Sequence, residues 1–239
     1  MHLDTGDLIR EYLAALDEVD PGKSRSYFQT LYDDEPGAMA ATVRNIEDGL
    51  AHFPPGLVID VGCGHGLQAY AFTRHGRQVI GIDNQRYRVE RARAAAELLG
   101  VEIEYRHGDA TDALVGLRAG AVWLHRSINH LPDLPRFFAA VHPVVDPDGA
   151  LVFVTSNARS RRALRFLPFV RPGRHELPSL TRDLIAAGFV VADVDYHGYS
   201  VALPARIRPN RAEDIDRRLA RTPGIRTLAG SFTVTARPG

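Results

Sequence analysis

The chain has 239 residues, 45% of them hydrophobic, and its 29 basic and 29 acidic side chains leave no formal net charge. A chain of this length can bury the core of one α/β domain, and its neutrality argues against nucleic acid as a partner. No run of 18 apolar residues is present, so we expect no membrane-spanning helix.

The first ten residues contain acids and no apolar core of a signal peptide. The only cysteine, Cys63, rules out an internal disulfide and is typical of a reducing compartment. We therefore expect a cytoplasmic protein.

Residues 1–55 have the apolar spacing of helices. Leu8, Tyr12 and Leu16 lie on one helical face, and a second helical stretch covers 36–53. Pro54, Pro55 and Gly56 end it. We expect 1–55 to form a helical cap on a domain that covers 56–239, the two making one structural unit.

From residue 57 onwards, short apolar runs alternate with helical stretches. Strands are predicted at 57–59, 78–82, 101–105, 121–124, 151–154, 189–194 and 231–236, and helices after Gly66, before Gly100, at 135–145 and at 179–187. This alternation predicts an α/β fold with a mostly parallel sheet and helices on both faces. Ligands of such sheets bind at the carboxyl ends of the strands, so functional residues are expected there.

The first strand is followed by a glycine-rich loop, Asp60-Val61-Gly62-Cys63-Gly64-His65-Gly66. Gly62 and Gly64 allow a tight turn and let a ligand lie against bare main chain. Because a strand precedes the loop and a helix follows it, the loop is expected to hold a nucleotide-like cofactor through Asp60, Gly62, Cys63 and Gly64.

Acids also follow the second and third strands. Asp83, with Asn84 beside it, is placed to accept hydrogen bonds from ribose hydroxyls. Asp109 and Ala110 are placed to contact an adenine ring. Each acid could instead cap the helix that follows it, and that alternative is strongest for Asp109.

These residues together resemble the class I S-adenosylmethionine-dependent methyltransferases, over about 57–154. The loop 60–66 matches the acidic-x-Gly-x-Gly-x-Gly signature of that family, and Asp83 and the Gly108-Asp109-Ala110 segment match its ribose and adenine sites. The resemblance implies a Rossmann-like sheet of seven strands in the order 3-2-1-4-5-7-6, with the last strand antiparallel. It also implies an N-terminal helical lid, in which Tyr27 would contact the cofactor.

The resemblance has two departures. Where the family usually opens its fourth strand with Asp, this chain has Gly120 and Ala121, and the turn 145–149 reads Val-Asp-Pro-Asp-Gly instead of containing Pro-Gly-Gly. The missing acid puts in doubt the contacts that it supports in relatives, and leaves the expected fold unchanged.

Three residues after the fourth strand are candidates for chemistry or binding. His125 and Arg126 are expected near the methionine end of the cofactor. His130 could be a general base, or could only cap or pack at the start of a helix. The ten histidines show no metal-binding spacing, so we expect no metal.

The function expected from the sequence is S-adenosylmethionine-dependent methylation of a small molecule at oxygen or nitrogen. One alternative is a domain of the same fold that binds the cofactor without transferring its methyl group. Another is an NAD(P)-dependent oxidoreductase, but Leu67 stands where its fingerprint needs a third glycine. Residues 158–174, rich in arginine and apolar side chains, could bind substrate, form a homodimer surface or face solvent.

Overall fold

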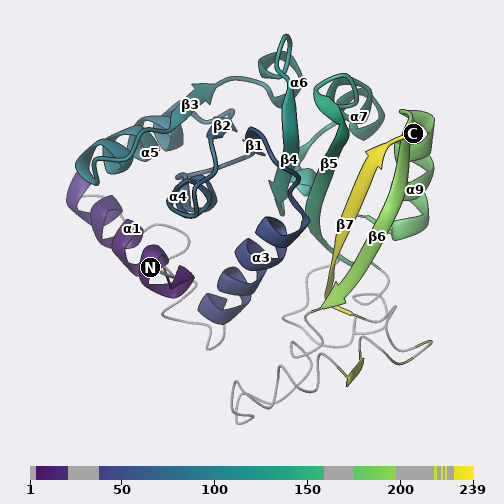
Figure 1. Cartoon of the computed structure of the whole chain (residues 1–239), viewed down its shortest axis with the longest axis horizontal. Coiled ribbons are helices and arrows are strands. Elements are labelled where there is room, and N and C mark those ends of the chain that lie inside the picture. The colour runs from purple at the N-terminus through teal and green to yellow at the C-terminus, as the bar shows by residue number, and fades with distance from the viewer. Residues whose placement is uncertain are drawn as a thin grey trace.

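The computed structural model describes residues 4–20, 38–158, 175–197, 218–219, 222, 224 and 229–239. Seven strands form one sheet in the order β3-β2-β1-β4-β5-β7-β6 (Figure 1). They are β1 (Val58–Val61), β2 (Val79–Asp83), β3 (Glu104–His107), β4 (Ala119–His125), β5 (Val145–Ser156), β6 (Phe189–His197) and β7 (Ser231–Pro238). Only β7 runs antiparallel to its neighbours, so the predicted fold class and strand order are confirmed.

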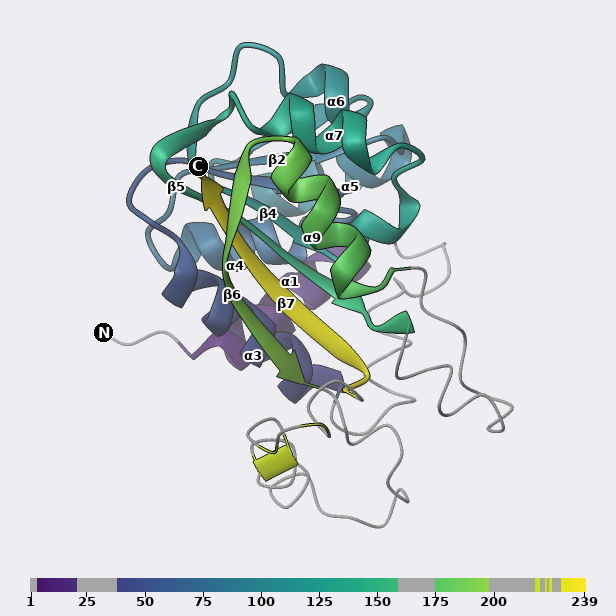
Figure 2. The same cartoon turned by 90° about the vertical axis from the view of Figure 1, so that its right-hand side faces the viewer.

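Helices cover both faces of the sheet (Figures 1 and 2). One face packs against α1 (Thr5–Val19), α3 (Ala38–His52), α4 (Leu67–Arg74) and α5 (Arg86–Leu98). The other packs against α6 (Ala110–Ala113), the short 3₁₀ helix η1 (Ser127–His130), α7 (Leu134–Val141) and α9 (Leu177–Ala186). Because β1 and β2 have helices on both sides, each of their residues is buried.

Two strands begin three or more residues away from their predicted starts. β3 begins at Glu104 instead of 101, because the end of α5 takes up the preceding residues: the Val101 N–H donates to the Ala96 carbonyl, and Gly100 has φ 64°. β5 begins at Val145, inside the segment predicted as a turn, because Val145 pairs with Ala119 of β4 across a register shift.

The first helix is part of the folded core. Ile9, Tyr12 and Leu16 are fully buried among residues of α4 and α5. The proposal that 1–55 closes over the site as a lid depends also on residues 21–37, which are outside the described part. Of the helices in the described ranges, none is long and apolar enough to cross a membrane.

Candidate functional site

The glycine loop between β1 and α4 folds back over the carboxyl end of the neighbouring strand. The N–H groups of Gly62 and Cys63 both donate to the Ile82 carbonyl of β2, at 2.7 and 3.0 Å, and Gly66 donates to Cys63 at 2.9 Å. Gly62, Gly64 and Gly66 all have left-handed φ angles, between 58° and 87°. The loop therefore needs glycine for its backbone conformation. The N–H groups of Gly62, Cys63 and Gly66 are hydrogen-bonded to carbonyls of the protein itself.

The three glycines have different surroundings. A Cβ on Gly62 would lie 2.3 Å from the Cβ of Ser127, and one on Gly66 would lie 2.4 Å from the Tyr105 hydroxyl. A Cβ on Gly64 would meet no described atom within 4 Å. Of these three glycines, Gly64 is therefore the one whose main chain faces open space. A ligand that binds against the backbone of the loop requires such a position.

Asp83 connects the glycine loop to the turn after β2. One carboxylate oxygen accepts from the Gly64 N–H at 2.9 Å, and the other from the Gln85 N–H at 2.8 Å. The capping residue of α5 is Gln85, so Asp83 stabilises the turn and is not the cap of the helix. Each of its oxygens keeps lone pairs that can accept from a ligand hydroxyl. Asn84, next to it, is exposed, and its carbonyl lies 3.2 Å from the Nε2 of His107.

Asp60 is a buried acid at the carboxyl end of β1. It is 1% exposed, and its Oδ2 has no hydrogen-bond partner among the described residues. Burial raises the pKa of this carboxyl to about 8, the charge of Asp83 adds to the rise, and a hydrogen bond from the Ala69 N–H opposes it. An unsatisfied buried carboxyl costs free energy, which a cationic group bound next to it would offset.

His125 is enclosed by two amide side chains. Its Nδ1 lies 3.1 Å from the amide Nε2 of Gln68 on α4, and its Nε2 lies 3.1 Å from the amide Nδ2 of Asn45 on α3. Burial, with the nearby charge of Arg126, lowers the pKa of His125 to about 3. A neutral imidazole has one N–H and one acceptor nitrogen, so one amide must present its oxygen instead. Both ring nitrogens are thus engaged within the protein, and a direct cofactor contact through them stays a prediction.

The segment after β4 turns sharply beside the glycine loop. Arg126 has φ 60°, the only positive value of a non-glycine residue in the described ranges, and its side chain is exposed. Ser127 then donates to the Val61 carbonyl at 2.6 Å, which ties the start of η1 to the end of β1. Backbone strain of this kind is common at binding sites, so the expected role of Arg126 stays a prediction with that support.

His130 ends η1 and is exposed at the carboxyl edge of the sheet. Its neighbour Asn129 accepts from Thr155 of β5 at 3.2 Å, which fixes η1 against the sheet. His130 does not cap the helix that follows it, because the N-cap of α7 is Asp133, which accepts from the Arg136 N–H at 3.0 Å. The position suits a base that meets substrate from solvent, and the base role stays a prediction.

Asp109 has the capping role that the sequence left open. It is the N-cap of α6 and accepts from the Thr111 N–H at 2.9 Å. Its side chain is exposed and Ala110 is half-buried, so capping leaves an oxygen of Asp109 for an adenine amine. Tyr27 lies outside the described residues, as do 159–174 of the arginine-rich segment. In the described ranges, no three His, Cys, Asp or Glu side chains group as a metal site.

Three polar residues around His125 and Arg126 were not predicted from the sequence. Gln68 and Asn45 are buried and enclose His125, and His197 at the end of β6 lies 3.1 Å from the Thr233 hydroxyl. Burial lowers the pKa of His197 to about 4, and so do the charges of Arg44 and Arg126. Gln68 and Asn45 occupy positions within helical stretches, where no local pattern distinguishes a buried amide from an exposed one.

Comparisons with known proteins bear on the family and the fold. Residues 59–153 match the family model described as a methyltransferase domain. A ubiquinone biosynthesis O-methyltransferase of Brucella melitensis biotype 2 is 31% identical over 66% of this chain and 68% of its own length. Another, of Azorhizobium caulinodans, is 26% identical over 57% of this chain, which spans only 60% of that relative's length. A crystal structure of an S-adenosylmethionine-dependent methyltransferase from Clostridium acetobutylicum shares the fold, with a TM-score of 0.63 and 11% identity, over 89% of this chain and 96% of that one.

Proposed function

Because the chain belongs to the class I S-adenosylmethionine-dependent methyltransferases, we propose that it transfers a methyl group from S-adenosylmethionine to an oxygen or nitrogen atom of a small-molecule acceptor. The observation that carries the proposal is the open face of the glycine loop at Gly64, with two buried acids, Asp60 and Asp83, beside it. An oxidoreductase is not supported, because Leu67 begins α4 fully buried where the dinucleotide fingerprint needs glycine.

The residues at this edge suit S-adenosylmethionine, which supplies an activated methyl group on a sulfonium. Asp83 would accept from the ribose hydroxyls, with Asn84 beside it, and the unsatisfied oxygen of Asp60 suits the ammonium of the methionine part. Asp109 and Ala110 would hold the adenine. Their placement after successive parallel strands puts all of them at one edge of the sheet.

The acceptor side of the site is the carboxyl end of β4. Bringing acceptor and methyl into line and excluding water supply much of the rate of such a displacement. His130 would take the proton of an acceptor hydroxyl, for which its exposed position is suitable. Both relatives carry the names of O-methyltransferases, which favours oxygen over nitrogen.

The proposal extends to the setting of the enzyme. Residues 1–55 would form a cap on the domain 56–239, with Tyr27 over the cofactor. A cytoplasmic location is supported by Cys63, the only cysteine, which is buried and unpaired. A homodimer would use the apolar side chains of 164–170, beyond the described ranges.

Thermal unfolding with four ligands tests the proposal. S-adenosylmethionine and S-adenosylhomocysteine should each raise Tm, because a ligand of the native state stabilises it, while NAD and NADP should not. Incubation with S-adenosylmethionine and a panel of phenols and amines should then yield S-adenosylhomocysteine, measured by mass spectrometry. Stabilisation by NAD alone would refute the assignment. Binding without turnover across the panel would favour a cofactor-binding domain.

Proton release provides a second test. Asp60 has a pKa of about 8 and is largely protonated at pH 7. A bound ammonium would lower that pKa, so binding at pH 7 should release a proton, and affinity should rise with pH up to about 8. Calorimetry in buffers of different ionisation enthalpy measures this release. It should vanish in Asp60→Asn, and equal release in both proteins would remove Asp60 from the ammonium site.

A further inference from the structure

Two buried tyrosines contact the glycine loop at the two residues that follow Gly64. The hydroxyl of Tyr12, on α1, donates to the His65 carbonyl at 2.7 Å. The hydroxyl of Tyr105, on β3, donates to the Gly66 carbonyl at 3.3 Å. Tyr12 is 0% exposed and Tyr105 is 3% exposed. Two segments far apart in the sequence thus each bond one carbonyl of the loop.

The two hydroxyls meet at Gly66. A Cβ on this residue would lie 2.4 Å from the Tyr105 hydroxyl and 2.6 Å from the Tyr12 hydroxyl. The third glycine of the loop is therefore required by these phenols as well as by its φ of 87°. The N–H groups of Gly62, Cys63 and Gly64 are bonded to β2 and to Asp83, and the phenols bond the carbonyls of the two residues that follow, so hydrogen bonds hold the loop along its length.

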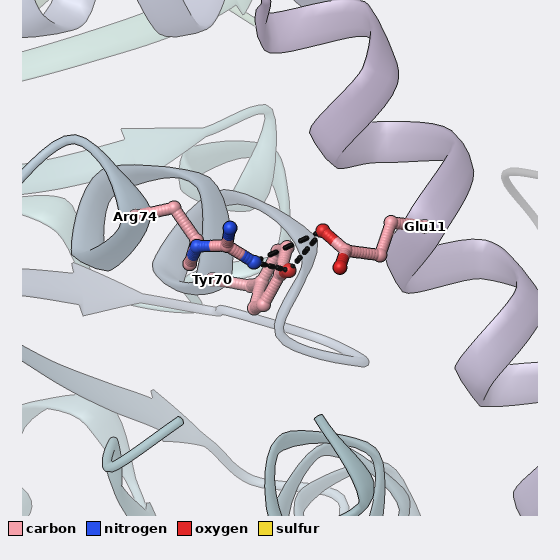
Figure 3. A network of polar contacts seen from close by, with 3 residues as sticks. All are labelled: Glu11, Tyr70 and Arg74. Carbon is pink, nitrogen blue, oxygen red and sulfur yellow. Dashed lines mark hydrogen bonds and ion pairs between the residues drawn. The ribbon is translucent and has the colours of Figure 1, made fainter. Parts of the chain in front are cut away.

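Tyr12 is also the point where α1 reaches the loop. Its ring stacks on Tyr70 of α4 with centroids 4.7 Å apart. A separate polar contact joins the same two helices: Glu11 of α1 accepts from the Tyr70 hydroxyl at 2.6 Å and from Arg74 at 3.0 Å (Figure 3). The chain thus has two phenols at the α1–α4 interface, of which Tyr12 bonds the loop and Tyr70 does not.

We propose that Tyr12, assisted by Tyr105, is a positioning residue that holds the glycine loop in its cofactor-binding conformation, so that docking of α1 and binding of the cofactor are coupled. The inference rests on the proposed function, because the loop is taken to bind S-adenosylmethionine. It assigns to the first helix a role in cofactor affinity that involves no contact with the cofactor.

The physical basis is the freedom of the loop. Three glycines within five residues would sample many conformations if released, and ordering them on binding would weaken affinity. Hydrogen bonds to the His65 and Gly66 carbonyls impose that order beforehand. The phenols remain donors at any ordinary pH, because burial raises the pKa of Tyr12 and of Tyr105 well above the usual value. Coupling of this kind is reciprocal, so the cofactor should stabilise the docking of α1.

The test compares two variants that each remove one phenol hydroxyl from the same helix interface. In Tyr12→Phe, the affinity for S-adenosylhomocysteine by calorimetry should fall about 2- to 10-fold, as for one net hydrogen bond. In Tyr70→Phe, which loses the contacts to Glu11 and Arg74, Tm should fall while affinity stays unchanged. Tyr105→Phe provides a second variant, with the direction of change expected for Tyr12→Phe, because its hydroxyl bonds both the Gly66 carbonyl and the Tyr12 hydroxyl.

Equal affinity of Tyr12→Phe and the wild type, or an equal loss in Tyr70→Phe, would overturn the inference. Failure of the wild type to bind would instead overturn the proposed function, so the two failures are distinct. Hydrogen exchange adds a readout without turnover. S-adenosylhomocysteine should slow exchange in α1 of the wild type, and less so in Tyr12→Phe. Unchanged exchange of wild-type α1 on binding would contradict the coupling.

Discussion

Gly64 is the residue of the glycine loop at which a side chain would extend into space free of described protein atoms. A methyl group there would meet the ligand and would also strain the backbone, because φ is 58°. We expect Gly64→Ala to weaken S-adenosylhomocysteine binding at least tenfold, measured by calorimetry. The stability of the free protein should fall by about 1–2 kcal/mol, the cost of a left-handed non-glycine residue.

Gly100 provides the matched control. Its φ is 64°, and a Cβ there would also meet nothing within 4 Å, but it lies at the end of α5 and away from the loop. Gly100→Ala should therefore lose similar stability and keep full affinity. If Gly64→Ala binds as tightly as Gly100→Ala, the open face of the loop does not hold the cofactor.

His130 tests the chemistry at the residue scale. A hydroxyl acceptor needs a base, whose help is typically worth about 10²- to 10⁴-fold in rate. His130→Asn keeps a hydrogen-bonding side chain but cannot take the proton, so kcat should fall by that factor while cofactor affinity stays unchanged. Initial rates of S-adenosylhomocysteine formation at saturating concentrations of a phenol that the enzyme methylates measure kcat. A variant at near full rate would make His130 a positioning residue and would favour an acceptor that needs no base.

Individual residues were predictable where a local rule applied. The spacing of Asp60, Gly62 and Gly64, and the place of Asp83 after a strand, follow from the geometry of strand, loop and helix. The surroundings of each residue were not predictable. That Gly62 faces Ser127 and Gly66 faces two phenols depends on contacts across 39 or more residues of sequence, about which a local pattern carries no information.

At the scale of elements, α1 belongs to the core. Leu16 is fully buried in the cluster that includes α4 and α5. Leu16→Ala should therefore lower the free energy of unfolding by about 2–5 kcal/mol, as buried leucines do elsewhere. Arg10 of the same helix is exposed, with a surface ion pair to Asp7, so Arg10→Ala should change stability little. Urea unfolding of both compares them, and equal effects would mean that α1 is not docked in solution.

The elements themselves were largely predictable, because apolar periodicity specifies them. The misplaced bounds are informative. β3 starts three residues later than predicted, because the Val101 N–H bonds the Ala96 carbonyl at the end of α5. β5 starts six residues earlier than predicted, because Val145, at the start of the expected turn, pairs with Ala119 of β4. In the first case a hydrogen bond that ends a helix, and in the second the pairing of two strands, overrides what the apolar periodicity of the segment predicts.

At the scale of the whole molecule, buried ionisable groups set the dependence of stability on pH. Burial lowers the pKa of His65, His125 and His197 to about 4, 3 and 4, so these rings stay neutral in the native state. In the unfolded chain they take up protons below about pH 6.5. Their contribution to stability is therefore present above pH 6.5 and lost as pH falls through 6.5 towards 4.

Asp60 acts in the opposite direction. Its native pKa of about 8 lies above the ordinary value of 3.8, so its contribution is present below about pH 4 and lost as pH rises through 8. Between pH 4 and 6.5 the unfolded chain gains up to three protons on the histidines, against one that the native state keeps on Asp60. The histidines prevail there, and stability should rise with pH. Between 6.5 and 8 Asp60 is the main contributor among the described groups, and stability should fall. Burial also raises the pKa of Cys63, which adds to the fall near the upper end of this range.

The cofactor-free protein should therefore be most stable near pH 6.5, measured as the free energy of unfolding in urea from pH 4.5 to 8.5. Burial raises the pKa of Asp48 and of Asp195, so the native state keeps their protons longer than the unfolded chain does. This makes the rise of stability with pH shallower at the acid end, and stability still rises with pH once both carboxyls are ionised. Asp60→Asn separates the two limbs, because it removes the decline between pH 6.5 and about 8, leaves the acid limb, and leaves the smaller decline that Cys63 causes above pH 8. A decline of equal slope between pH 6.5 and 8 in Asp60→Asn and the wild type would show that the buried Asp60 carboxyl does not titrate near pH 8.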